Sequence, residues 1–363
     1  MRPASFALVL LLTAASGSPA AQAPAAPTPP RDHLLVCNKA AHSLSIFVPG
    51  ERREVATLPT GRGPHEVAVA ADGNLAVVTD YGDQKPGQTL TVVDIGKRQV
   101  VRTIDLVAAE TDAEGKPRQK AFLRPHGVQF VAADKVVVTS ESSRRLLLVD
   151  VVKGTIERTW TTPQATMHMV SVSSDLRTAA ATSIKDGNVV LFALAGDGPA
   201  ASAPIACGEE SEGLAVQPGT GLVWVGNRRG NTVSVVDPTT AKATHTLATG
   251  DFPFRIAFTA DGKQALVSCA EGGQVMVFDA KTHAVLREVS IHADGSELSA
   301  MPMGIAVDPD GARAYVACGR GEFVAVVDLA AGTVVDRLPA RAGCDGIAFA
   351  RAAAVPAADG LRR

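Results

Sequence analysis

Apolar and polar residues alternate along most of the chain, and the alternating segments return at regular intervals. Five of them end in aspartate: LTVVD at 90–94, LLLVD at 146–150, VSVVD at 233–237, VMVFD at 275–279 and VAVVD at 324–328. Degenerate copies are LSIFV at 44–48 and VVLFA at 189–193. Alternation with period two predicts β-strands, and a spacing of about 42 to 56 residues is typical of propeller blades rather than of helical repeats.

Each repeat contains four segments of strand character separated by turn residues. The second repeat shows them plainly, as HEVAVA, LAVVTD, TLTVVD and QVVRTIDL between residues 65 and 106. Asp-Gly pairs at 72–73, 261–262 and 310–311 supply the positive φ that tight hairpins need. The pattern therefore predicts four-stranded units.

The two ends of the repeat region complete one another. LLVCNKA at 34–40 has the character of a second strand without an innermost strand before it, and DGIAFA at 345–350 is an innermost strand with no blade after it. Pairing them closes a ring of seven blades and removes the open sheet edge. We therefore predict an all-β fold, a seven-bladed β-propeller that forms one domain over residues 34–350.

The repeat also resembles a known family. The segment VSVVDPTTAKATHTLATGDFPFRIAFTADGKQALVS at 233–268 is similar to the YVTN-type propeller repeat, and the resemblance extends over about residues 34–350. A WD40 propeller is disfavoured because the Gly-His and Trp-Asp signature is missing. The resemblance implies the fold, whereas function has to be argued from a site.

The termini have a different composition. Residues 1–20 carry one Arg, a short apolar run and small residues, which predicts a cleaved signal peptide rather than a membrane span. A Pro/Ala-rich linker at 21–33 follows, and we expect a disordered tail at 351–363. The mature protein is expected to be periplasmic or secreted.

Composition narrows the range of partners. Apolar residues make up 46% of the chain and aromatic residues only 4%, so the core must be aliphatic. The formal net charge of −2 provides no overall basic field, which disfavours nucleic acid as the main partner. We expect a monomer, with a protein partner left open.

The cysteines do not form a known metal-binding or haem-attachment motif. There are five of them and no CxxC or CxxCH spacing, which disfavours structural zinc and haem attachment. Cys37, Cys269 and Cys318 fall within apolar strands and are expected to be buried. Cys207 and Cys344 could be reactive or paired, although not with each other, because their blades are not neighbours.

A column of equivalent residues at the start of the innermost strands contains most of the candidate chemistry. It comprises His65, His126, His168, Glu212, Phe254, Met303 and Asp345. Innermost strands line the central channel of a propeller, so these side chains are expected to converge at one mouth of that channel. Packing does not require polar residues at five of these seven positions, and such clusters are candidates for functional sites.

The ends of the second strands are expected on the same face. They comprise Asn38, Asp80, Ser140, Ser183, Asn227, Cys269 and Cys318, with Lys39, Tyr81, Glu141 and Arg228 following four of them. Asn227 and Arg228 are candidate ligand-binding residues here. The alternative is that the Asn and Ser side chains only cap turns. The long connections 105–124 and 289–302 open on this face too.

Three interpretations of the histidine column remain open. The imidazoles could simply hydrogen-bond neighbouring loops. They could bind an anion or a divalent metal ion, with His65, His126, His168, Glu212 and Asp345 as ligands, since imidazole with carboxylate suits Zn, Cu, Fe or Ni. They could also be catalytic.

The catalytic interpretation rests on a second resemblance. GPHEVAVAADGNLAVVTDYGD at 63–83 and RPHGVQFVAADKVVVTSES at 124–142 are similar to paired motifs of the seven-bladed lactonase group, which includes 6-phosphogluconolactonase and muconate-lactonising cycloisomerases. His65, Asp80, Asp83, His126 and Glu141 match these motifs, Arg124 is displaced by one position, and Ser140 replaces an Asn. The resemblance implies His65, Arg124, His126 and Glu141 as catalytic residues and Asp80 and Asp83 as ligand-binding residues.

The sequence thus supports three functional hypotheses. The first is an exported propeller that binds a small molecule or metal ion at the channel mouth. The second is a lactonase-like hydrolase or isomerase acting on an acidic sugar lactone, and the third is a protein-interaction scaffold.

Overall fold

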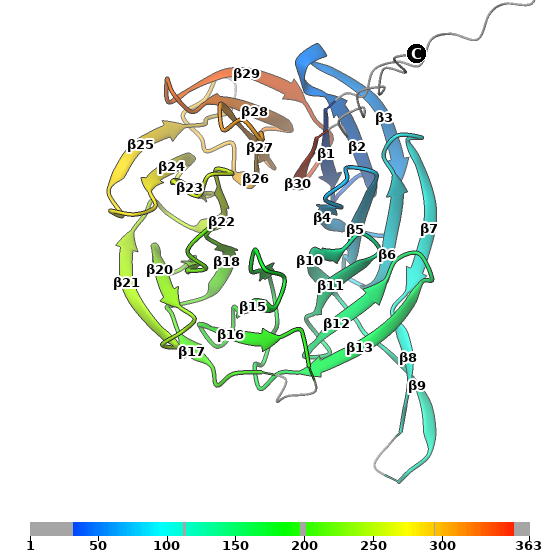
Figure 1. Ribbon diagram of the computed structural model, residues 1–363. Coiled ribbons are helices and arrows are strands. Elements are labelled where there is room, and N and C mark those ends of the chain that lie inside the picture. Colours follow the sequence, from blue (N-terminus) through cyan, green and yellow to red (C-terminus); the bar gives the residue numbers. More distant parts are fainter. Residues whose placement is uncertain (1–31, 112–113, 197–200, 294, 352–363) are drawn as a thin grey trace, which may run out of the picture.

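The computed structural model describes residues 32–111, 114–196, 201–293 and 295–351. In this part of the chain, seven four-stranded antiparallel sheets surround a central axis, and a two-stranded sheet stands outside the ring (Figure 1). The predicted all-β, seven-bladed propeller is therefore confirmed.

The blades are numbered in ring order, with the inner strand of each named first. Blade 1 consists of β30 (Cys344–Ala350), β1 (His33–Asn38), β2 (Ser43–Val48) and β3 (Arg53–Pro59), with the 3-10 helix η1 (Pro49–Glu51) after β2. Blade 2 consists of β4 (Pro64–Val69), β5 (Leu75–Gly82), β6 (Pro86–Asp94) and β7 (Gln99–Asp105). Blade 3 consists of β10 (Pro125–Ala132), β11 (Lys135–Ser140), β12 (Arg145–Asp150) and β13 (Thr155–Thr161).

The other four blades follow the same order. Blade 4 consists of β14 (Val170–Val172), β15 (Thr178–Ser183), β16 (Asn188–Ala193) and β17 (Ile205–Ala206). Blade 5 consists of β18 (Ser211–Val216), β19 (Val223–Asn227), β20 (Thr232–Asp237) and β21 (Lys242–Ala248). Blade 6 consists of β22 (Pro253–Phe258), β23 (Gln264–Cys269), β24 (Gln274–Asp279) and β25 (Val285–Ser290). Blade 7 consists of β26 (Pro302–Val307), β27 (Arg313–Cys318), β28 (Phe323–Asp328) and β29 (Thr333–Pro339).

Neighbouring blades share aliphatic cores. Leu90 and Val92 of blade 2, for example, pack in one buried cluster with Val136 and Leu147 of blade 3. Because the side chains of a strand alternate between its two faces, each middle strand contributes to the core on both sides of its blade. The period-two pattern in the sequence thus places every blade between two apolar layers.

The recurring aspartate at the end of the third strands makes turns. The Asp150 carboxylate accepts hydrogen bonds from the amides of Val152 (3.0 Å) and Lys153 (2.7 Å). Asp279 accepts the same bonds from Lys281 (3.0 Å) and Thr282 (2.7 Å). These carboxylates therefore cap the turn that leads to the outer strand.

The ring closes within blade 1, as the sequence predicts. The C-terminal strand β30 pairs antiparallel with β1, with Leu34 opposite Phe349, Leu35 opposite Ala348 and Val36 opposite Ile347. The innermost strand of blade 1 thus comes from the opposite end of the repeat region.

The inner strands approach one another closely. A Cβ atom added at Gly346 would lie 2.2 Å from the carbonyl oxygen of His65, and one added at Gly213 would lie 2.2 Å from that of Phe254. Glycine is needed at these positions because the backbone of the next blade occupies the space of a side chain.

Two features differ from the expectation. The connection 105–124 contains a hairpin of β8 (Val107–Thr111) and β9 (Pro117–Ala121), which Figure 1 shows projecting away from the ring. Its strands are mostly polar, so the apolar pattern did not indicate them. Blade 4 is also reduced, because β14 spans three residues and β17 only two.

Some predictions fall outside this description. Residues 1–31 and 352–363, which include the predicted signal peptide, most of the linker and most of the tail, are not among the described residues. Within the described ranges, no helix has both the length and the apolar character needed to cross a membrane.

Candidate metal centre at the channel mouth

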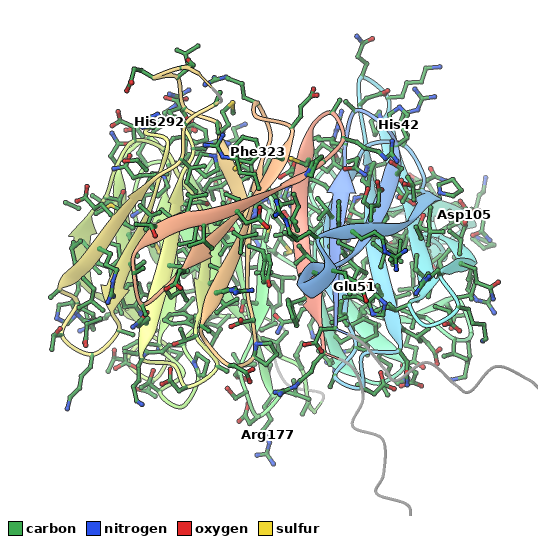
Figure 2. The ribbon with its side chains drawn as sticks, turned by 90° about the horizontal axis from the view of Figure 1, so that it is seen from above. His42, Glu51, Asp105, Arg177, His292 and Phe323 are labelled. Atoms are coloured by element: carbon green, nitrogen blue, oxygen red, sulfur yellow. The ribbon has the colours of Figure 1, made fainter. Side chains whose placement is uncertain are left out.

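The inner strands begin on one face of the disc. Figure 2 shows the disc edge-on, with His42 and His292 at one face and Arg177 at the other. His42 lies between β1 and β2, and His292 follows β25, so both belong to connections on the face where the inner strands start. The candidate site lies on this face, as predicted.

Three imidazoles lie next to one another, with tilted ring planes, at the start of blades 2, 3 and 4. The ring centroids of His65 and His126 are 4.1 Å apart, and those of His126 and His168 are 3.6 Å apart. His65 and His126 lie on β4 and β10, whereas His168 precedes the short strand β14. The structure thus brings together residues that are more than 40 positions apart in sequence.

Hydroxyl groups of the second strands hold this column in place. Thr79 donates to the carbonyl oxygen of His126 (2.8 Å), and Thr139 donates to that of His168 (2.5 Å). Thr182 makes the same bond to Glu212 (2.7 Å). Each of these three blades therefore fixes the backbone of the column residue in the following blade.

His126 is the most unusual of the three imidazoles. It is fully buried, and no hydrogen-bond partner within the described residues contacts either of its ring nitrogens. Burial, together with the neighbouring imidazoles of His168 and His65, lowers the pKa of His126 well below its usual value. His126 is therefore a neutral imidazole, and an unsatisfied buried polar group of this kind is costly unless something binds it.

His168 lies between two carboxylates. Its Nε2 is 2.7 Å from Glu212 Oε1, and its Nδ1 is 3.5 Å from Glu141 Oε2. Burial lowers the pKa of His168, but the charges of Glu212 and Glu141 outweigh it and raise the pKa above its usual value. A carboxylate next to one ring nitrogen is the usual partner of a metal-binding histidine, and Glu212 holds this position at His168.

Glu212 is itself held by two guanidinium groups. Arg228 Nη1 donates to Glu212 Oε2 (2.7 Å), and Arg255 Nη1 donates to Glu212 Oε1 (3.1 Å). Burial would raise the pKa of Glu212, but His168, Arg255 and Arg228 hold it well below its usual value. The predicted ligands Glu212 and Arg228 thus support His168 from behind.

Arg255 crosses the channel axis. From blade 6 it donates through Nε to Glu66 Oε1 on blade 2 (3.0 Å), and its Nη2 contacts the same oxygen. Figure 1 shows β22 and β4, which carry these two residues, on opposite sides of the ring. Burial would raise the pKa of Glu66, but Arg255 and His65 lower it to about 2. The bridge is an ion pair buried on the axis.

Sequence reasoning missed Glu66 and Arg255. Both belong to the position directly after the histidine column, which is glycine in four of the blades: Gly127, Gly213, Gly304 and Gly346. One acid and one base in a column that otherwise contains only glycine and Met169 are the signal that could have found them.

His65 has its own carboxylate partner. Its Nδ1 lies 3.2 Å from Asp345 Oδ2, and Lys39 Nζ lies 3.8 Å from the same oxygen. Asp345 thus stands beside His65 as Glu212 stands beside His168, so these two predicted ligands flank the outer imidazoles.

Two groups of potential metal ligands result. In the first, ligand atoms of His65, Glu66 and His126 all lie within 4.8 Å of one another. In the second, the same holds for His126, Glu141 and His168. The carboxylates that belong to these two groups are Glu66 and Glu141. The predicted ligands Glu212 and Asp345 lie closer to single ring nitrogens, at 2.7 Å from His168 and 3.2 Å from His65, but they belong to neither group.

Side chains near the ends of the second strands form hydrogen bonds within their own blades. Asn227 Nδ2 donates to Thr232 (3.0 Å) and Ser234 (2.9 Å), and the Asp80 carboxylate accepts from Thr89 (2.7 Å) and Thr91 (2.9 Å). Burial raises the pKa of Asp80 to about 6. The geometry gives Asp80 and Asn227 the capping role that was the alternative to ligand binding.

Of the two remaining residues of the lactonase-like set, Arg124 contacts Tyr81 and Asp83 does not. The Tyr81 ring centroid is 5.3 Å from those of His65 and His126, and the Arg124 guanidinium is 4.7 Å from the Tyr81 ring centroid. The Asp83 carboxylate instead accepts a hydrogen bond from Arg62 (2.9 Å). Arg124 therefore lies near the imidazoles, whereas the side chain of Asp83 is engaged elsewhere.

The cysteines are not part of the site. All five lie within the described ranges and are free, which confirms that Cys207 and Cys344 do not bridge. Cys37, Cys269 and Cys318 are buried as predicted. Burial raises the pKa of both Cys207 and Cys344 to about 12, so neither is a reactive thiolate at neutral pH.

Comparisons with known proteins agree on the fold. A family model described as YNCE-like beta-propeller matches residues 181–305. No curated protein matches the chain significantly. The crystal structure of a functionally unknown protein from Desulfotomaculum acetoxidans DSM 771 is similar with a TM-score of 0.67 and 15% identity, covering 88% of this chain and 99% of that one. Together with the seven sheets, these likenesses show that the chain is a seven-bladed β-propeller, and they support the resemblance of its repeats to the YVTN type.

Proposed function

We propose that the protein binds a divalent transition-metal ion at the mouth of its central channel, through His126, Glu141 and His168. The observation that carries this proposal is His126, a fully buried imidazole between two others with neither ring nitrogen bonded to any described residue. A bound metal ion would satisfy the lone pair that the protein leaves open.

The donor set favours a particular group of metals. Imidazole nitrogens with a carboxylate oxygen suit Zn, Cu(II), Ni and Fe(II), whereas Ca and Mg prefer sites made only of oxygen ligands. Glu212 behind His168 and Asp345 beside His65 supply the outer carboxylates that usually orient metal-binding imidazoles. Their positions support a metal rather than an anion as the primary ligand.

A direct test is metal titration of the purified full-length protein. We expect Zn, Cu or Ni to raise the melting temperature, because a ligand at 100 times its dissociation constant stabilises the folded state by about 2.7 kcal/mol. His126→Ala should abolish this rise. His245→Ala, which removes an exposed imidazole on β21, is the matched control and should respond like the wild type. A wild type that neither retains metal nor responds to any of these ions would contradict the proposal.

A second candidate function is lactone hydrolysis or isomerisation. It is favoured by the placement of Arg124 against Tyr81, next to His65 and His126, where a cationic group could hold an acidic substrate. Screening acidic sugar lactones with and without a chelator distinguishes the two functions. Turnover that Arg124→Ala abolishes and a chelator leaves unchanged would support the lactonase.

We further propose that the protein acts outside the cytoplasm, since residues 1–20 have the composition of a signal peptide. Mass determination of the protein recovered from periplasm and medium would reveal cleavage. A full-length chain found only in the cytoplasm would exclude export.

A further inference from the structure

We propose that the site holds two metal ions and that His126 bridges them through its two ring nitrogens. This inference rests on the proposed function, and it adds a second ion and a distinct role for one residue. The first ion would bind His65, Glu66 and His126, and the second would bind His126, Glu141 and His168.

The first argument is that the two ligand groups share one residue. Each group has ligand atoms within 4.8 Å of one another, and His126 is common to both. Its ring stands between the other two, with centroid distances of 4.1 Å to His65 and 3.6 Å to His168. An imidazole in this position has a candidate ligand group on each side.

The second argument comes from the outer nitrogens. A histidine that binds one metal normally gives its other ring nitrogen to a carboxylate, a carbonyl or water. His168 follows this rule through Glu212 (2.7 Å), and His65 has Asp345 at 3.2 Å. His126 does not follow it, because no described residue bonds either nitrogen. The outer imidazoles are thus arranged as terminal ligands, and the middle one as a bridge.

The third argument is that each ligand group has its own carboxylate. Glu66 reaches the first group from β4 of blade 2, and Glu141 reaches the second from the residue after β11 in blade 3. Both contacts of Arg255 with Glu66 are made to Oε1, so they leave Oε2 as the oxygen for a metal. One carboxylate per ion is what two neighbouring dications require to offset their mutual repulsion.

The proton balance is simple. A neutral His126 carries one N–H, and its other nitrogen offers a lone pair to the first ion. The second ion replaces the remaining N–H proton, which passes to solvent and leaves a bridging imidazolate. No electron is transferred in this step.

Copper(II) is the most informative probe of the full-length protein. We expect wild type to bind about two copper ions per chain, with an integrated electron paramagnetic resonance signal well below that of the total copper, because an imidazolate couples the two spins. Glu141→Gln should lower the stoichiometry to about one and restore the full signal of the remaining copper. His65→Ala should remove the copper of the other ligand group and likewise restore the full signal of the remaining copper. It should leave the ion pair between Glu66 and Arg255 in place.

Each outcome decides a different question. One copper per chain with full signal intensity would overturn the second ion and leave the proposed function intact, whereas no bound copper would overturn both. Two coppers with full intensity would overturn the bridge. Glu209→Gln, a carboxylate near the same face that belongs to neither ligand group, is the matched control and should retain the wild-type stoichiometry and coupling.

Discussion

One buried position near the end of the second strand holds different side chains in different blades, and a charged side chain there affects stability. Ser140 and Asn227 end the second strands of their blades, Asp80 lies near the end of β5, and all three are fully buried. An amide can both donate and accept there, as Asn227 does toward Thr232, Ser234 and Ser211. A carboxylate at the same position must keep its charge away from water.

The charge of Asp80 makes stability depend on pH. Its folded pKa of about 6 lies above the unfolded value of 3.8, so the native state binds the proton more tightly, and stability falls as pH rises from about 4 to 6. Asp80→Asn should therefore raise the free energy of unfolding at pH 7.5 by about 1–3 kcal/mol, with no gain at pH 4. Urea denaturation at the two pH values measures this.

The reciprocal change is the control. Asn227→Asp places a carboxyl group at the equivalent position of blade 5 and should destabilise the protein at pH 7.5 more than at pH 4. A gain from Asp80→Asn that is equal at both pH values would mean that burial of the charge is not its cause.

At the level of elements, the second strand of one blade positions the candidate ligand residue of the next. Thr139 of β11 accepts from the amide of Gly127 (2.8 Å) and donates to the carbonyl oxygen of His168 (2.5 Å). Through this hydroxyl, a strand of blade 3 fixes the backbone of His168 in blade 4. The site is therefore built by contacts between blades.

Thr139→Val should separate stability from binding. The loss of these hydrogen bonds is expected to cost about 1–2 kcal/mol of stability and also to weaken metal affinity, because His168 is released. Thr139→Ser should restore both. Ser234→Ala removes an equally buried hydroxyl that donates to the Cys207 carbonyl (3.2 Å), and it should lower stability without changing affinity. Calorimetric metal titration of the three variants checks this; equal affinity in Thr139→Val and wild type would refute the positioning role.

Much of the element-level structure follows from sequence, and the failures have physical reasons. The column of His65, His126 and His168 is predictable, because equivalent positions of a closed ring must meet at its axis. Arg255 and Glu66 were missed because their contact crosses the axis between blades 6 and 2, which depends on side-chain reach and ring diameter rather than on local pattern. Glu66 directly follows His65, and neighbouring residues of a regular strand point to opposite faces. The local backbone geometry therefore decides that both side chains reach the same ligand group.

For the whole molecule, closure depends on one strand from the far end of the chain. The pairing of β30 with β1 places Ile347 in the apolar cluster that includes Val36 and Val324. Without it, blade 1 would expose the inner edge of β1, and unpaired edges promote aggregation.

Two truncations test this dependence. A chain ending at Gly343 should lose cooperative unfolding or aggregate, since a complete inner strand and its apolar contacts are missing. A chain ending at Arg351 should melt within a few degrees of the full-length protein, because it keeps all of β30. Thermal scans followed by light scattering compare the two, and matching melting curves would refute closure by strand exchange.

The position of Asp345 on this last strand also has a consequence for biosynthesis. The ribosome makes β30 after every other strand, and Asp345 is the carboxylate beside His65. A nascent or prematurely terminated chain can therefore present the imidazoles but not the finished surroundings of His65. If the proposed site binds metal, the ligand group that contains His65 would acquire its complete surroundings only in finished chains, whereas the group of His126, Glu141 and His168 would not depend on β30.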